Sequence, residues 1–177
     1  APPPHTHPIP RRHSLMCIRD RCIFIQFFMF CSLFCERIEL IPTTAENINR
    51  HIASFKGEKA VLLNIWALWC APCIEEFPMI VNLQKKNNDL EVIFVSVDFE
   101  DQFQDVINFL KNHNVRTVSY IKSQKDDIFI NGIHDDWSGS LPFTLIYAKK
   151  SGKIVDYWEG IKKERKFKKA ISSALVL

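Results

Sequence analysis

A pair of cysteines directly after a buried-strand pattern constrains the fold of this chain more than any other feature. Ala60–Trp66 is an apolar run, which is typical of a strand buried on both faces. Trp69-Cys-Ala-Pro-Cys73 follows at once, and apolar side chains then recur at helical spacing. We therefore expect a helix that begins at Cys70 and carries the cysteine pair at its N-terminal end.

A helix N-terminus gives the two sulfur atoms different chemistry. Its unpaired N–H groups and the positive end of its dipole stabilise a thiolate, which is the form of cysteine that attacks a disulfide. We expect Cys70, at the helix start, to be the nucleophile, and Cys73, one turn further on, to resolve the mixed disulfide. Pro72 suits a first helical turn, where its missing N–H costs little.

Cysteine usage favours chemistry over cross-linking. Only Cys70 and Cys73 lie in the folded part, because the other four cysteines are at positions 17, 22, 31 and 35. A zinc site is one alternative, but it needs two more ligands, and the later histidines show no paired spacing. An inert structural disulfide is the other, but so short a loop stabilises little. The prediction is a redox pair with no metal and no cofactor.

The net charge is confined to the start of the chain. Four arginines and one aspartate in residues 1–35 account for the overall +3, and the remainder holds 19 basic and 19 acidic residues. A neutral folded part has no charge excess to attract nucleic acid or an anionic membrane surface. We therefore expect no nucleic-acid partner.

The first 35 residues differ from the rest of the chain and divide into two segments, 1–21 and 22–35. Residues 1–21 are interpreted as a disordered or artefactual leader. They begin rich in Pro and His, and 16–21 resemble a translated sequencing adapter; a genuine start at Met16 is the alternative. Residues 22–35 are apolar and follow Arg19 and Arg21, which fits a signal peptide better than a full membrane span. A cleaved signal, a retained membrane anchor and a buried core segment are all open readings.

Residues 36–177 predict one α/β domain. Helices are expected over 43–55, 101–113 and the C-terminal stretch that holds Phe167 and Ala174. Strands are expected at 91–97, 118–121 and 128–133, and a hairpin joins 142–147 to 154–158 through a Gly turn. Parallel strands thus come first and an antiparallel pair last, with helices on both faces of a central mixed sheet.

The run from Asn64 to Pro78, NIWALWCAPCIEEFP, resembles the thioredoxin superfamily, and most of all its extracytoplasmic TlpA/ResA branch. Trp69 and the Cys-x-Pro-Cys core are common to the superfamily, and Glu76-Phe-Pro marks the branch. Leu141-Pro142 matches the loop whose proline is cis in this superfamily. The resemblance extends from about Phe55 to the C-terminus and implies a thioredoxin fold.

The resemblance also assigns further site residues. Asn64 stands where cytoplasmic thioredoxins have a buried Asp, and it cannot accept a proton, so the resemblance implies that Glu76 exchanges protons with Cys73. An ordinary exposed Glu is the alternative. We expect substrate to bind at Trp69, Pro72, Leu141 and Pro142.

Three aromatic residues are candidates to border this site. Trp66 fits the core better, because it lies in an apolar strand, whereas Trp137 in its polar loop is harder to explain as core. Phe143 follows the expected cis proline. The residues around that proline also lack the Gly and Glu that are usual in the cytochrome-maturation subgroup. This difference argues against assigning that subgroup's substrate to this chain.

These features together predict a thiol-disulfide oxidoreductase that reduces protein disulfides outside the cytoplasm, in the periplasm or anchored to a membrane facing outward. A dithiol there is oxidised to a disulfide after one turnover and must be reduced again, so a membrane electron donor is a predicted partner. A peroxide-reducing thiol enzyme of the same superfamily is one alternative, against which the vicinal cysteine pair counts. A non-enzymatic thioredoxin-fold binding module is another, against which the intact cysteines and Pro142 count.

Overall fold

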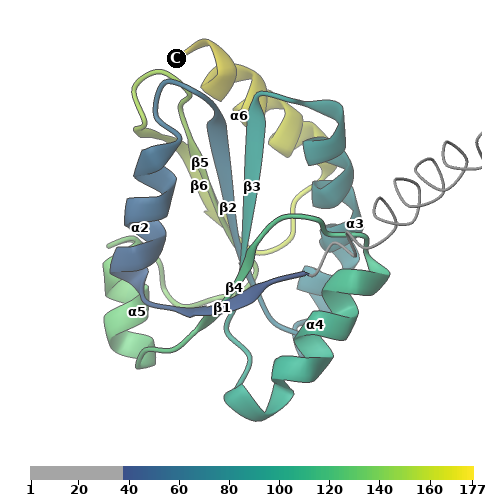
Figure 1. Ribbon diagram of the computed structural model, residues 1–177. Coiled ribbons are helices and arrows are strands. Elements are labelled where there is room, and N and C mark those ends of the chain that lie inside the picture. The colour runs from purple at the N-terminus through teal and green to yellow at the C-terminus, as the bar shows by residue number, and fades with distance from the viewer. Residues whose placement is uncertain (1–37) are drawn as a thin grey trace, which may run out of the picture. The chain divides into compact units, whose positions relative to one another are not determined.

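Six strands form one mixed sheet in the computed structural model, which describes residues 38–177 (Figure 1). The strands lie in the order β1-β4-β3-β2-β5-β6. The first four pair in parallel, and β5 pairs antiparallel with both β2 and β6. Their bounds are β1 Leu40–Thr43, β2 Ala60–Trp66, β3 Leu90–Ser96, β4 Ser119–Lys122, β5 Phe143–Tyr147 and β6 Ile154–Glu159. The interpretations of residues 1–21 and 22–35 lie outside the described residues.

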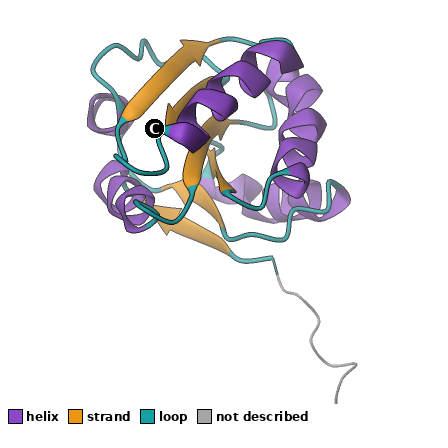
Figure 2. Cartoon of the chain, turned by 90° about the horizontal axis from the view of Figure 1, so that it is seen from above, coloured by secondary structure: helices purple, strands orange, loops and turns teal. Residues whose placement is uncertain are grey.

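Helices cover both faces of the sheet, as Figures 1 and 2 show. Side chains of α2 and α5 pack into the hydrophobic cluster on one face, and those of α3, α4 and α6 pack into the cluster on the other. Their bounds are α2 Ala45–Ser54, α3 Ala71–Lys86, α4 Phe103–Asn112, α5 Asp126–Ile133 and α6 Glu164–Val176, with a 3-10 turn, η2, at Glu100–Gln102. The expected α/β thioredoxin fold is confirmed. Within residues 38–177 no helix has the length and apolar character needed to cross a membrane.

Alternation along β2 explains how one strand serves both layers. Side chains of a strand point to opposite faces in turn. Leu62 and Trp66 belong to the cluster under α3, α4 and α6, whereas Leu63 and Ile65 belong to the cluster under α2 and α5. Asn64 has the same parity as Leu62, so it points to the α3 side of the sheet. One polar side chain is therefore placed beneath the helix that carries the cysteines.

Strand β1 is missing from the sequence-based expectations. Its four residues include Pro42, and proline is depleted in strands because it cannot donate to a ladder. The strand lies at the edge of the sheet and pairs only with β4, where a missing donor on the outer side is tolerated. Residues 40–43 therefore form a strand because they pair with β4, almost eighty residues away in the sequence.

The expected strand at 128–133 is wrong, because these residues belong to helix α5. Two aspartates in the first turn favour the helix, and the buried Phe129 and Ile133 are four residues apart, which is helical spacing. Gly132 faces α2 so closely that a Cβ atom would lie 2.7 Å from the Ala45 Cβ. The glycine thereby lets two helices of one layer approach each other.

Candidate active site

The cysteine pair lies at the N-terminus of α3, as expected. Cys70 is the N-cap residue, and Pro72 lies in the first turn of the helix. The two cysteines form a disulfide, and the Cys73 N–H donates to the Cys70 sulfur at 3.3 Å. The first turn of the helix contains no acidic residue that would oppose a thiolate there. Cys70 is 6% exposed and Cys73 is 1% exposed, so Cys70 is the more accessible of the two residues.

Glu76 lies one helical turn after Cys73 and is only 3% exposed. Residues three apart on a helix lie on the same face, so Glu76 and Cys73 are neighbours along α3. Asn64 Nδ2 donates to its Oε1, and the backbone N–H of Lys162 donates to its Oε2, both at 3.3 Å. Burial raises the pKa of Glu76 to about 7 despite these hydrogen bonds, so the group can exchange a proton near neutral pH. The adjacent Glu75 is exposed, so the alternative of a surface residue applies to Glu75 and not to Glu76.

The Asn64 side chain joins Glu76 to the sheet. Its Nδ2 also donates to Thr144 Oγ1 at 3.1 Å, and Asn64 and Thr144 are register partners of the β2–β5 pairing. Both residues are buried. Sequence reasoning did not identify Thr144, because its link to the site depends on the pairing of strands eighty residues apart.

A buried aspartate holds the loop that leads into the cysteine motif. Both carboxylate oxygens of Asp98 accept from the Leu68 N–H at 3.0 Å, and Ser96 Oγ donates to Oδ2 at 2.7 Å. Burial raises the pKa of Asp98, while the hydrogen bonds from Ser96 and Leu68 lower it. Sequence reasoning missed this residue. A lone acid at the end of an apolar strand was the only available signal.

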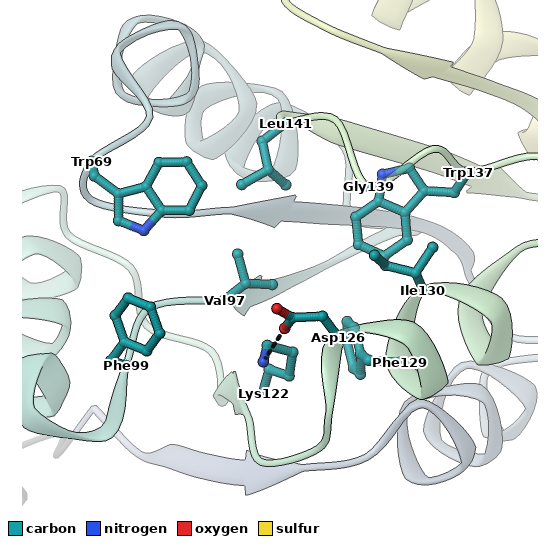
Figure 3. Close-up of a pocket in the computed structure, with 10 residues that line it drawn as sticks. All are labelled: Trp69, Val97, Phe99, Lys122, Asp126, Phe129, Ile130, Trp137, Gly139 and Leu141. Atoms are coloured by element: carbon teal, nitrogen blue, oxygen red, sulfur yellow. Dashed lines mark ion pairs between the residues drawn. The ribbon is translucent and has the colours of Figure 1, made fainter.

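The loop before β5 lies at the end of the sheet where β2 leads into the cysteine motif. The peptide bond between Leu141 and Pro142 is cis, which confirms this part of the expectation. Leu141 packs against the hydrophobic cluster that includes Cys70 and Cys73. Trp69, which precedes Cys70, is 61% exposed and lines a cavity together with Leu141 (Figure 3). The structure therefore brings Trp69, Pro72, Leu141 and Pro142 to the same end of the sheet as the cysteines.

The three candidate aromatic residues divide between core and cavity. Trp66 is buried and contacts Phe77, with ring centroids 4.8 Å apart, so it is core as favoured. Trp137 is also buried and stacks on Phe143 with ring centroids 4.9 Å apart. Its indole N–H donates to the Ser140 carbonyl, which explains how a polar loop can supply a core residue. Trp137 also lines the cavity beside the site.

A mixed sheet of this order, a disulfide at the N-terminus of α3 and a cis proline before β5 together define the class. The protein is a thiol-disulfide oxidoreductase of the thioredoxin superfamily. The model of the Redoxin family matches residues 38–132, and the chain belongs to that family.

Comparison with known proteins agrees with the expected TlpA/ResA-like branch. The chain is 30% identical over 122 residues to the thiol-disulfide oxidoreductase ResA of Bacillus cereus strain ZK / E33L, covering 68% of this chain and 66% of that protein. It is 28% identical over 125 residues to ResA of Bacillus thuringiensis subsp. konkukian, and the match covers 71% of this chain and 68% of that protein. The thioredoxin-family thiol:disulfide interchange protein of Chlorobium tepidum TLS has a similar structure, with a TM-score of 0.57, 24% identity, and coverage of 69% and 83%.

Proposed function

We propose that this protein reduces disulfide bonds of protein substrates outside the cytoplasm. Cys70 attacks the substrate disulfide, Cys73 resolves the mixed disulfide, and Glu76 exchanges the proton with Cys73. Trp69, Pro72, Leu141 and Pro142 form the substrate-binding surface. The observation that carries the proposal is the cysteine pair at the N-terminus of α3 with a buried carboxyl group one turn further on. The curated ResA relatives, which are named as thiol-disulfide oxidoreductases, support it.

The direction of electron flow follows from the surroundings of the pair. A strong oxidant needs a specially stabilised reduced form, with a potential of about −120 mV, whereas thioredoxin lies at about −270 mV. Ala71 and Pro72, between the cysteines, add neither a charge nor a side-chain hydrogen-bond donor. Little in the motif therefore stabilises the thiolate beyond the helix N-terminus itself. This composition favours a reductant.

The location and the electron donor belong to the same proposal. The apolar segment 22–35 behind Arg19 and Arg21 has the pattern of an export signal or anchor. In an oxidising compartment, the disulfide that forms in a reductant at each turnover must be reduced again before the next one. A membrane-borne dithiol donor is the class of partner that would supply these electrons.

The test is the equilibrium potential of the Cys70–Cys73 couple, measured in glutathione buffers. We expect a value closer to about −270 mV than to about −120 mV. A potential more oxidising than the glutathione pool would reverse the direction and leave the dithiol chemistry intact. Peroxide turnover measured on the same protein tests the peroxidase alternative, and absence of both activities would favour a binding module.

A further inference from the structure

A cavity opens beside the cysteine pair, between the active-site loops and helix α5 (Figure 3). Four separate parts of the chain supply its apolar walls. They are Trp69, then Val97 and Phe99, then Ile130 on α5, and finally Trp137 and Leu141. Figure 3 shows Trp69 and Phe99 on one side of the space and Trp137 and Ile130 on the other. Trp69 and Phe99 are 61% and 72% exposed, so two aromatic rings stand open to solvent at this site.

The size and polarity of the cavity fit one neutral ring. Its volume is about 170 Å³, and an apolar protein cavity of about 150 Å³ takes up benzene. The charged residues in its wall neutralise each other, because Lys122 Nζ lies 2.6 Å from Asp126 Oδ1. Lys122 Nζ also donates to the Gln124 carbonyl. A charged side chain entering the cavity would lose its water without gaining a free partner of opposite charge.

The position of the cavity ties it to the redox reaction. Trp69 directly precedes Cys70, and Leu141 directly precedes the cis Pro142. Within residues 38–177 the backbone N–H and C=O of Leu141 form no hydrogen bond with another backbone group outside the strand ladders. An extended substrate segment can pair with this free backbone edge, and its neighbouring side chains then reach the cavity walls. Successive residues of an extended chain advance about 3.3 Å, so residues within two positions of the substrate cysteine lie within about 7 Å of it along the strand.

We propose that this cavity binds one aromatic side chain of the protein substrate, located within about two residues of the cysteine that Cys70 attacks. The inference rests on the proposed function and adds a substrate class to it. The preferred substrates carry a Phe-like residue beside the reducible disulfide, and those with a charged residue there are disfavoured. Helix α5 is the specificity element, because it supplies Ile130 and the charge-compensating Asp126.

The reaction used for the test is a single turnover of the reduced protein. The substrates are short peptides whose one cysteine is joined to 5-thio-2-nitrobenzoate through a disulfide. The Cys70 thiolate attacks the peptide sulfur, which forms a Cys70–peptide disulfide and expels the coloured thionitrobenzoate. The Cys73 thiolate then attacks Cys70, which re-forms the intramolecular disulfide, and the peptide thiolate leaves and takes up a proton. The two electrons come from the reduced cysteine pair.

Peptides that differ only in carrying Phe, Ala or Asp at each position within two residues of the cysteine are compared on the full chain. Thionitrobenzoate release by the Cys70→Ser protein is subtracted, because residues 1–35 hold four further cysteines. At one position we expect the rate constant for Phe to exceed that for Ala by roughly tenfold, and that for Asp to be lowest. Equal rates for Phe and Ala at every position overturn the inference, whereas no release above the background overturns the proposed function itself.

Substitutions in α5 connect the preference to the cavity. Ile130→Trp fills the space and should lower the ratio of the Phe rate to the Ala rate to about one. Ile128→Trp is the matched control, because Ile128 is on the same helix, 51% exposed and outside the cavity. Ile130→Ala enlarges the cavity and should shift the preference from Phe toward Trp, which keeps the test decisive if Ile130→Trp fails to fold. An unchanged Phe preference in the folded Ile130 variants contradicts the inference.

Discussion

At the scale of single residues, the two cysteines differ in their surroundings. Cys70 caps the helix and receives the Cys73 N–H, whereas Cys73 is more deeply buried beside Glu76. We therefore predict that Cys73→Ser accumulates a mixed disulfide between Cys70 and a protein substrate, because no resolving thiol remains. Non-reducing electrophoresis and mass spectrometry identify the linked residue. Accumulation in Cys70→Ser instead would reverse the two roles.

Glu76 makes the stability of the oxidised protein depend on pH. Its pKa is about 7 in the folded protein against an ordinary value of 4.5, because burial disfavours the charged form. A raised carboxyl pKa contributes stability that is fully present below the unfolded pKa and is lost as the pH rises through the folded pKa. We predict that the free energy of unfolding falls by about 3 kcal/mol from this group between pH 4 and pH 8.

Urea denaturation of the oxidised protein at several pH values measures this effect. Glu76→Gln should remove most of the pH-dependent loss, and the exposed neighbour substitution Glu75→Gln should retain it. In the reduced protein, Glu76→Gln should also remove an inflection near pH 7 from the rate of disulfide exchange. Identical pH profiles for the wild type and Glu76→Gln would exclude the proton-exchange role.

At the scale of elements, the loop between β2 and α3 is attached to the end of β3. Asp98 is buried and accepts the Leu68 N–H with both oxygens, two residues before Cys70. We predict that Asp98→Ala lowers the free energy of unfolding by about 1–3 kcal/mol, because the Leu68 N–H and the Ser96 hydroxyl lose their acceptor in a buried place. Urea denaturation at pH 7 measures the loss.

A second readout separates loop attachment from general stability. The amide protons of Leu68 and Trp69 should exchange faster in Asp98→Ala, while those of β2 change only with global stability. Asp101→Ala is the control, since Asp101 is an exposed acid in the following turn. Unchanged exchange at Leu68 would show that Asp98 does not hold the loop.

At the scale of the whole molecule, the proposal requires the domain to lie outside the cytoplasm. We predict that alkaline phosphatase fused after Leu177 is active in a bacterial host when residues 1–177 are complete and inactive when 22–35 are deleted. The phosphatase needs disulfides that form only in an oxidising compartment. Immunoblotting confirms equal amounts of the two fusions. Activity that survives the deletion would remove the export role from this segment.

The sequence by itself determined the elements whose signals are local. The apolar run at Ala60–Trp66, the Cys-Ala-Pro-Cys start of α3 and the Gly turn between β5 and β6 are each readable within about twenty residues, because strand, helix-start and turn preferences act over short distances. The cis bond before Pro142 and the role proposed for Glu76 came from family resemblance. The local pattern alone does not distinguish Glu76 from Glu75.

Tertiary structure decided what depends on partners distant in the chain. Strand β1 exists because β4 pairs with it, and packing of the buried face of α5 with α2 in one hydrophobic cluster adds to the local helix signals at 128–133. The burial of Glu76 by Asn64 and Lys162, the Asp98 link to Leu68 and the cavity beside Trp69 each join segments from different parts of the sequence. Such contacts form only once the sheet has brought these segments together, so no local pattern in the sequence encodes them.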